Sequence, residues 1–137
     1  TGKTAVAHDA VKPSLAVFFL IADQAIKNSI SSTTSFLGVV FPRVTNTGAS
    51  FGIFQGYNTA LIISSILILS GIVWYRDELP AWSVWLFLAG GVSNTVDRIV
   101  HGHVIDYISI GWWPVFNIAD AMLCVGVAIV IYDEVTS

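Results

Sequence analysis

The chain alternates long apolar runs with short polar segments. We predict four helices from these runs, over about 11–30, 59–75, 80–100 and 115–132. Each run is close to the roughly 20 apolar residues that a helix needs to cross a bilayer. The pattern therefore predicts an all-α integral membrane protein with four transmembrane helices, forming a single membrane domain over residues 1–137.

Two longer connections separate the apolar runs. The first contains the β-branched stretch 39–45, with turn residues after it, which is typical of short strands. We expect a small extracytoplasmic β element over about 38–56, on the outer membrane surface. The second connection, residues 101–114, is expected on the same side of the membrane.

Composition agrees with a membrane protein and excludes other classes. The chain is 55% hydrophobic and only 11% charged, whereas soluble domains are about 25% charged. A net charge of −3 without any cluster of Lys or Arg argues against nucleic-acid binding. The single cysteine, Cys124, excludes an internal disulfide and a metal site built on cysteines.

Basic residues give the expected orientation. Lys27 and Arg98 belong to polar motifs and are set aside as topology signals. The remaining basic residues on the side of the termini are Lys3, Lys12 and Arg76, against Arg43 on the other side. Because basic residues favour the cytoplasmic side, we expect both termini in the cytoplasm.

Polar residues converge at one end of the predicted bundle. Successive helices run in opposite directions, so the ends of the first and third helices meet the starts of the second and fourth. The polar residues expected at this level are Asp23, Lys27, Asn94, Asp97, Arg98, Asn117 and Asp120, with Asn46 and Asp106 in the connections. Ionisable groups at membrane depth are costly, so the cluster is read as functional. Two carboxyls that share one proton, such as Asp106 and Asp120, can activate water. Away from this cluster, Gly90 and Gly91 predict a tight contact between helices.

Four motifs occur in order between about residues 15 and 132. They are Asp23-Gln24-Ala25-Ile26-Lys27, Asn46-Thr47-Gly48-Ala49-Ser50-Phe51-Gly52, the stretch from Gly90 through Asn94 and Asp97-Arg98 to Gly102-His103-Val104-Ile105-Asp106-Tyr107, and Phe116-Asn117-Ile118-Ala119-Asp120. Together they resemble the lipoprotein signal peptidases, or signal peptidase II, which are bacterial intramembrane aspartyl proteases with four transmembrane helices. Ser93 departs from the resemblance, because a glycine is usual there.

The resemblance implies an activity and a role for each polar residue. It implies an aspartic endopeptidase that cuts a prolipoprotein just before a cysteine carrying a diacylglyceryl group, with Asp106 and Asp120 as the catalytic dyad. The substrate-binding residues would be Asn46, Gly48, Asn94, Arg98 and Asn117, and the supporting residues would be Asp23, Lys27 and Asp97. No metal or other cofactor is implied.

The resemblance also implies a cellular setting. It implies a multi-pass protein of the bacterial cytoplasmic (inner) membrane, with the active site near the outer leaflet. Membrane lipids and diacylglyceryl-modified prolipoproteins are the expected partners, nucleic acid is not, and we expect a monomer.

Three alternative interpretations remain open. His101 and His103, with Asp97 and Asp106, could supply metal ligands, although no fixed ligand spacing supports this. A proton-coupled carrier could relay protons through Asp23, Asp106 and Asp120, but it should spread polar groups towards the midplane. A non-catalytic membrane assembly subunit would not need the paired acids.

Overall fold

Four α-helices make up most of the chain. The structure, a computed structural model, describes residues 2–30, 34–37, 39–48 and 56–137. The helices are α1 (Gly2–Ser29), α2 (Asn58–Trp74), α3 (Ala81–His101) and α4 (Ile118–Thr136). The four predicted helices are therefore confirmed as helices. Within the described part of the chain, none of them combines the length and apolarity required of a membrane span.

The helix limits differ from the predicted ones at three places, the third being the end of α4, which continues to Thr136 rather than stopping near residue 132. α1 begins at Gly2 rather than near residue 11 and carries Pro13 inside it. α4 begins at Ile118 rather than near residue 115, because the Asn117 side chain caps it there. An asparagine cap satisfies a backbone N–H that has no partner within the helix, which favours a helix start at that position.

The strands form two small antiparallel sheets. β1 (Thr34–Phe36) pairs with β2 (Val39–Phe41), and β3 (Val44–Asn46) pairs with β4 (Val104–Asp106). The β element predicted over 38–56 therefore begins earlier, at Thr34, and its part from 49 to 55 lies outside the described residues. β4 lies in the segment 101–114, for which the sequence predicts only a connection.

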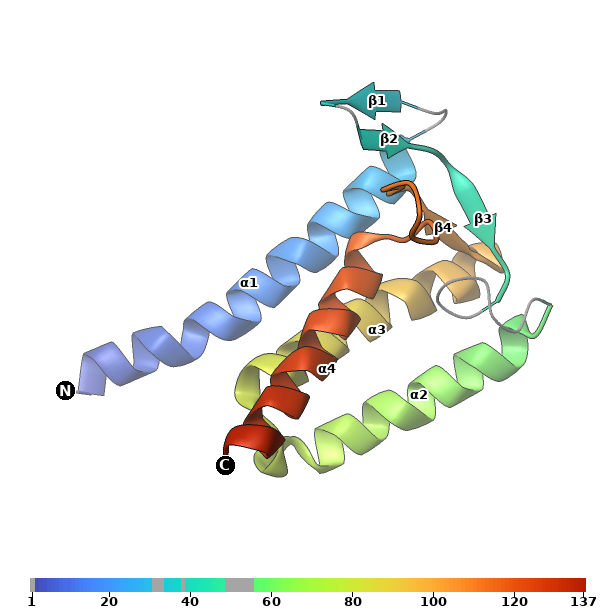
Figure 1. Cartoon of the computed structure of the whole chain (residues 1–137). Helices are drawn as coiled ribbons and strands as arrows, with labels where there is room; N and C mark the ends of the chain where they lie inside the picture. Colours follow the sequence, from blue (N-terminus) through green and yellow to red (C-terminus); the bar gives the residue numbers. More distant parts are fainter. Residues whose placement is uncertain (1, 31–33, 38, 49–55) are drawn as a thin grey trace.

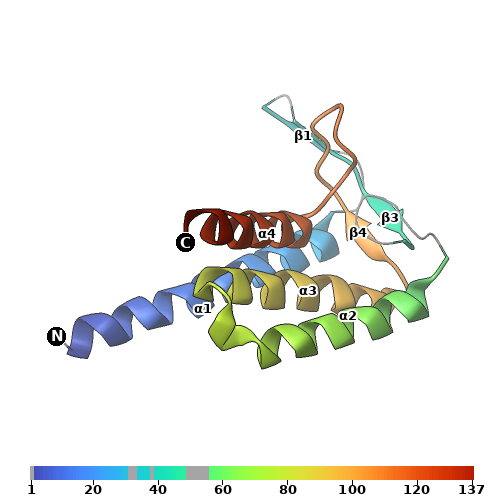
Figure 2. The same ribbon diagram turned by 60° about the horizontal axis from the view of Figure 1, so that its bottom comes forward.

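α3 is the central helix of the bundle, with α1, α2 and α4 packed around it (Figures 1 and 2). Glycines allow the closest approach between α3 and α4. A Cβ atom at Gly90 would lie 2.6 Å from the backbone oxygen of Ala119, and one at Gly126 would lie 2.6 Å from the Phe87 ring. A Cβ atom at Gly91 would lie 2.6 Å from Leu69 of α2. The tight contact predicted at Gly90 and Gly91 is thus confirmed.

A left-handed glycine turns the chain from α3 into β4. Gly102 has φ of 76° and caps α3, with its N–H bonded to the Arg98 carbonyl. A glycine adopts this conformation without steric cost. The turn brings Asp106 back beside the last turns of α3, and the chain then reaches α4 through a loop closed by backbone bonds between Ile108 and Phe116.

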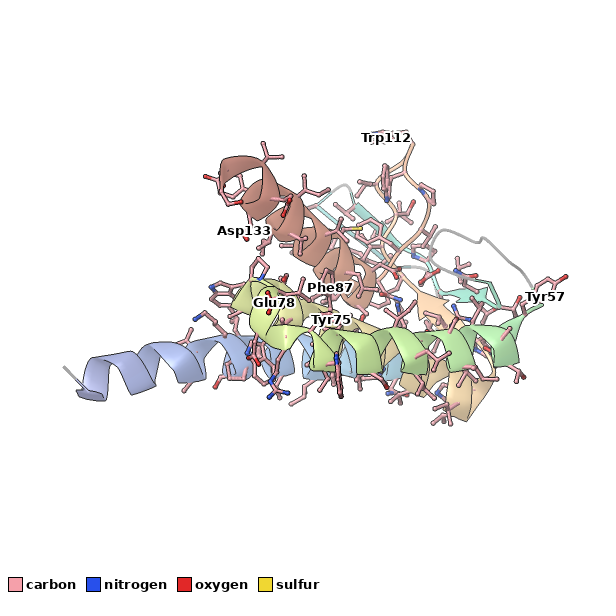
Figure 3. All side chains as sticks on the ribbon, turned by 90° about the horizontal axis from the view of Figure 1, so that it is seen from below. Tyr57, Tyr75, Glu78, Phe87, Trp112 and Asp133 are labelled. Carbon is pink, nitrogen blue, oxygen red and sulfur yellow. The ribbon has the colours of Figure 1, made fainter. Side chains whose placement is uncertain are left out.

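The two termini lie at the same end of the helix bundle, and both sheets lie towards the other end (Figure 1). The β1–β2 hairpin and the loop before α4 project together to one side of the bundle (Figure 2), joined by a bridge between Val40 and Ser109. Figure 3 shows Trp112 in this loop, away from the helices. The fold therefore separates a simple helical end from an end rich in connections.

Candidate active site

Asp106 is held at the end of β4 by two amide side chains. In the β3–β4 register Asn46 lies opposite Val104, which places it diagonally across from Asp106 on the same face. Asn46 Nδ2 donates to Asp106 Oδ2 at 3.2 Å, and Asn117 Nδ2 donates to Asp106 Oδ1 at 3.0 Å. Because Asp106 is only 3% exposed, these donors replace water around its carboxyl group.

Asp120 is positioned by the first turn of α4. Its backbone N–H donates to Asn117 Oδ1 at 2.8 Å, and its own Oδ2 accepts from the Asn117 backbone N–H at 3.2 Å. This reciprocal arrangement is a capping box. Asn94 Nδ2 of α3 donates to the other oxygen, Oδ1, at 3.0 Å. Both oxygens of Asp120 are thus oriented by neighbouring donors.

Two asparagines connect the carboxyl groups to each other. Asn117 Nδ2 donates both to Asp106 and to Asn94 Oδ1, the latter at 3.1 Å, while Asn94 donates to Asp120. The order of contacts is therefore Asp106, Asn117, Asn94, Asp120. Asn94 is half-buried, whereas Asn117 has no exposed surface. Four residues from β4, α3 and the start of α4 thus form one hydrogen-bonded unit.

The electrostatics of this unit favour a protonated Asp106. Burial, and next the nearby charge of Asp120, raise the pKa of Asp106 to about 7. The hydrogen bond from Asn46 and the positive charges of Lys27 and Arg98 oppose this rise. A pair of carboxyls that retains one proton near neutral pH can supply a base and an acid at the same time.

A second layer of buried charge surrounds Lys27. Its Nζ atom lies 2.6 Å from Asp23 Oδ2 and 2.9 Å from Asp97 Oδ2, and it donates to Asn94 Oδ1 at 3.1 Å. The three charged side chains are at most 2% exposed. Asp97 Oδ2 also accepts the Ile105 N–H of β4 at 3.3 Å. Lys27 therefore links the second layer directly to the unit that holds both aspartates.

Arg98 connects other parts of the predicted site. Its guanidinium group donates to the Gly48 carbonyl, just after β3, and to Asn58 Oδ1 of α2 at 3.4 Å. The Gly48 N–H in turn donates to Asn46 Oδ1 at 2.9 Å. Arg98 thus fixes the segment that carries Asn46. The predicted contact of Arg98 and Gly48 with substrate stays a prediction.

Every residue of the predicted site lies in one connected cluster. Sequence reasoning did not select Ser93 and Tyr107, whose hydroxyl groups both bond to Asp23. The departure at Ser93 from the glycine usual in the resembling family was a signal for the first. Tyr107 is the last residue of the third matching motif, but the resemblance assigns it no role.

Neither His101 nor His103 takes part in the hydrogen bonds described above for this cluster. The His101 and His103 rings pack with their centroids 5.9 Å apart, and His101 is exposed. Asp97, their suggested partner, is instead engaged by Lys27, Gln24 and the Ile105 N–H. Among the described residues, no group of three or more His, Cys, Asp or Glu side chains is arranged to hold a metal ion.

The sequence of this chain is similar to those of known proteins. Residues 15–136 match the sequence model of the family described as signal peptidase (SPase) II. The chain is 37% identical to the lipoprotein signal peptidase of Mycobacterium avium over 146 residues, covering 95% of this chain and 77% of that protein. It is 31% identical to that of Thermodesulfovibrio yellowstonii, covering 92% and 86%. With the Mycobacterium leprae protein, at 36% identity, the matched region spans 63% of the relative.

Solved structures resemble the whole fold. One, described as a bacterial membrane enzyme, superposes with a TM-score of 0.84 at 28% identity, covering 93% of this chain and 88% of that chain. A second, described in the same way, gives a TM-score of 0.78 at 28% identity, covering 91% and 92%. The overall fold of this chain is therefore shared with solved structures described as bacterial membrane enzymes.

Proposed function

This chain belongs to the signal peptidase II family, and on that premise we propose that it is a lipoprotein signal peptidase acting as an aspartic endopeptidase. Its substrate would be a prolipoprotein whose cysteine carries a diacylglyceryl group, and the bond cut would be the one just before that cysteine. The observation that carries the proposal is the pair of buried carboxyls, Asp106 and Asp120, joined through Asn117 and Asn94.

The surroundings of the two carboxyls favour different roles. Asp106 has its pKa raised to about 7 by burial and by Asp120, so it retains a proton to donate. Asp120 lies in the first turn of α4, where the helix dipole favours negative charge. We therefore assign the general acid to Asp106 and the general base to Asp120.

The reaction follows from these roles. Asp120 takes a proton from water as the water oxygen bonds to the scissile carbonyl carbon, while Asp106 donates a proton to the carbonyl oxygen. In collapse of the tetrahedral intermediate the C–N bond breaks. The cysteine nitrogen then takes the proton from Asp120, and Asp106 recovers its own from the hydroxyl group. The products are the signal-peptide carboxyl and the free amine of the lipidated cysteine.

The remaining site residues would hold the substrate. Asn94 is half-buried and borders the carboxyl unit, so its amide is placed to bond a peptide backbone beside Asp120. Asn46 ends β3 and Gly48 follows it, and Arg98 fixes this segment to α3 through the Gly48 carbonyl. We propose that this segment receives the peptide, with Arg98 and Asn117 shaping the pocket and Asp23, Lys27 and Asp97 supporting it. No metal or other cofactor takes part in this scheme.

We place the protein in the bacterial cytoplasmic membrane as a monomer. The structural relatives are described as bacterial membrane enzymes. Large apolar side chains on the helices also face outward, such as Phe18 at 62%, Leu67 at 67% and Ile68 at 63% exposed. In this placement the four helices span the bilayer with both termini in the cytoplasm, and the carboxyl pair lies near the outer leaflet.

The test is a gel-shift assay of a diacylglyceryl-modified prolipoprotein in detergent. Wild-type enzyme should cut just before the modified cysteine, with and without a chelator. Asp106→Asn and Asp120→Asn should each abolish cleavage while the proteins stay folded. Asp77→Asn is the matched control, because its side chain is 86% exposed at the far turn, and it should cleave normally.

Other outcomes would reject particular parts of the proposal. Retained cleavage in either aspartate variant would overturn the dyad. Loss of cleavage with the chelator alone would point to a metal site instead. No cleavage by folded wild-type protein would reject the peptidase activity and lead to proton-flux measurements.

A further inference from the structure

Asp23 is a buried carboxylate on which several elements converge. It has no exposed surface, and it lies on α1. Its Oδ2 atom accepts from Ser93 Oγ of α3 at 2.6 Å and lies 2.6 Å from Lys27 Nζ. Its Oδ1 atom accepts from Tyr107 Oη at 2.6 Å and from the Ile118 N–H, the first residue of α4, at 3.1 Å. One carboxylate thus joins α1, α3, α4 and the segment after β4.

Tyr107 links the chain beside Asp106 to the start of the helix that carries Asp120. It follows Asp106 directly in the chain, and it is 1% exposed. Its O–H group donates to Asp23, and its hydroxyl oxygen accepts from the Ile118 N–H at 3.1 Å. Ile118 lies one residue after the Asn117 cap and two residues before Asp120. The hydroxyl group of Tyr107 therefore connects the backbone next to one carboxyl with the helix start that carries the other.

The loop between Asp106 and Asn117 shows why the hydrogen bond from Tyr107 to Asp23 matters. Between Asp106 and Asn117 the chain forms a loop closed by the Tyr107 and Ile108 N–H groups, which both donate to the Phe116 carbonyl. These bonds hold the two arms of the loop together. The hydrogen bond from the Tyr107 hydroxyl to Asp23 differs from these bonds, because it ties the loop to another element, α1. Burial beside Asp23 raises the pKa of Tyr107, so its hydroxyl stays a donor.

We propose that Tyr107 is a positioning residue for the carboxyl pair, and that Asp23, oriented by Ser93, is the anchor through which it acts. This inference rests on the proposed peptidase function, because it concerns the spacing of the two aspartates. Tyr107 itself does not touch the substrate. Its hydroxyl fixes the distance and angle between β4 and the first turn of α4, and so between Asp106 and Asp120.

Removing a hydroxyl tests this without leaving a charge unpaired. Tyr107→Phe keeps the buried ring and deletes only the link to Asp23 and Ile118. We expect kcat to fall by roughly 10- to 100-fold, as small misplacements of reacting groups do, with KM little changed. Weaker coupling between the carboxyls should also move the alkaline limb of the pH profile to lower pH. The charged groups around the pair, Asp23, Lys27, Asp97 and Arg98, are unchanged in this variant.

Ser93→Ala is the second variant. It removes a donor to the opposite oxygen of Asp23, while Lys27 still bonds that oxygen. We therefore expect the same changes in kcat and pH profile, but smaller. If Tyr107→Phe cannot be purified folded, this variant decides the question alone. Tyr57→Phe is the control, because Tyr57 is 64% exposed at the start of α2, and its kinetics should match wild type.

A merely structural role predicts another result. In that case Tyr107→Phe would lower the thermal midpoint while kcat per folded enzyme and the pH profile stayed at wild-type values, and the proposal would be wrong. Hydrogen exchange of the peptide covering 116–121 gives a readout that needs no activity. It should become faster in Tyr107→Phe, and unchanged exchange would overturn the positioning role even if the wild-type protein failed to cleave. Absence of wild-type cleavage would count against the proposed function alone.

Discussion

At the residue scale, the molecule places acidic groups where water cannot stabilise them. Asp106 is surrounded by amide donors but still has its pKa raised to about 7, by burial first and then by Asp120. A carboxyl with a raised pKa is protonated below that value and loses its proton above it. The useful state, with one proton on the pair, is therefore lost as the pH rises through about 7.

The raised pKa of Asp106 predicts how cleavage depends on pH. Cleavage by wild-type enzyme should fall as the pH rises above about 7, because Asp106 then ionises beside Asp120 and no acid remains. The measurement is initial rate against pH at saturating substrate. Returning samples from pH 9 to pH 6.5 should restore the rate, which separates titration from unfolding. A rate that stays constant to pH 9 would contradict the assignment of the acid.

Lys27 gives a prediction about stability. It is the cation between Asp23 and Asp97, at 2.6 and 2.9 Å, and it has 1% exposed surface. Lys27→Met should lower the free energy of unfolding by about 3–5 kcal/mol, because two buried carboxylates then lose their counter-ion. Tryptophan fluorescence during denaturant unfolding in micelles measures this change.

Arg76→Met is the control for that experiment. Arg76 is 60% exposed, and its 3.8 Å pair with Asp77 is solvated, so unfolding should stay close to wild type. Equal effects of the two substitutions would show that burial of the Lys27 cluster does not matter.

At the element scale, α3 determines how close the site residues come. Asn94, Asp97 and Arg98 all lie on its last turns, and it packs against each of the other helices. Glycines line the contact between α3 and α4. Gly90 lies on α3 and Gly126 lies on α4. Close backbone approach is what allows the Asn94 amide to reach Asp120 at 3.0 Å.

Gly90→Ala tests this dependence. The new Cβ would lie 2.6 Å from the Ala119 backbone oxygen, so α3 and α4 must separate. We expect a loss of about 1–3 kcal/mol in stability, typical of overpacking, and a fall in cleavage because Asn94 moves away from Asp120. Gly71→Ala on α2 is the matched control, since a Cβ there meets nothing within 4 Å. Wild-type cleavage by Gly90→Ala would show that this contact does not set the site geometry.

The sequence was sufficient for the four helices and for bringing most residues of the candidate site to one end of the bundle. The apolar runs were long, and alternation of helix direction alone brings Asn94 and Asp120 to one end. β4 could not be predicted, because three residues carry too little pattern and their partner strand, β3, lies some 60 residues earlier. The role of Tyr107 depends on the path of the loop closed at Phe116, which local sequence does not determine. α1 exceeds its apolar run because residues 2–10, which mix alanines with polar residues, continue the helix back to Gly2.

At the scale of the whole molecule, the candidate site and the two termini lie at opposite ends of the bundle (Figure 1). α2 runs between these ends, with Tyr57 just before it and Glu78 in the turn after it (Figure 3). Its 17 residues correspond to about 25 Å at 1.5 Å per residue. In the proposed placement these two exposed residues lie on opposite sides of the membrane, Tyr57 outside and Glu78 in the cytoplasm.

Thiol labelling tests this orientation. Tyr57→Cys and Glu78→Cys are made separately in a Cys124→Ser background, which removes the single native thiol. A membrane-impermeant maleimide added to intact spheroplasts should label the variant at 57 and spare the one at 78 until the cells are lysed. Because the carboxyl pair lies at the end of the bundle near Tyr57, this pattern would also place the proposed reaction on the outer side of the membrane. Labelling at 78 but not at 57 in intact spheroplasts would show the opposite orientation in the membrane, with the candidate site on the cytoplasmic side. Labelling of both in intact spheroplasts would contradict a transmembrane α2.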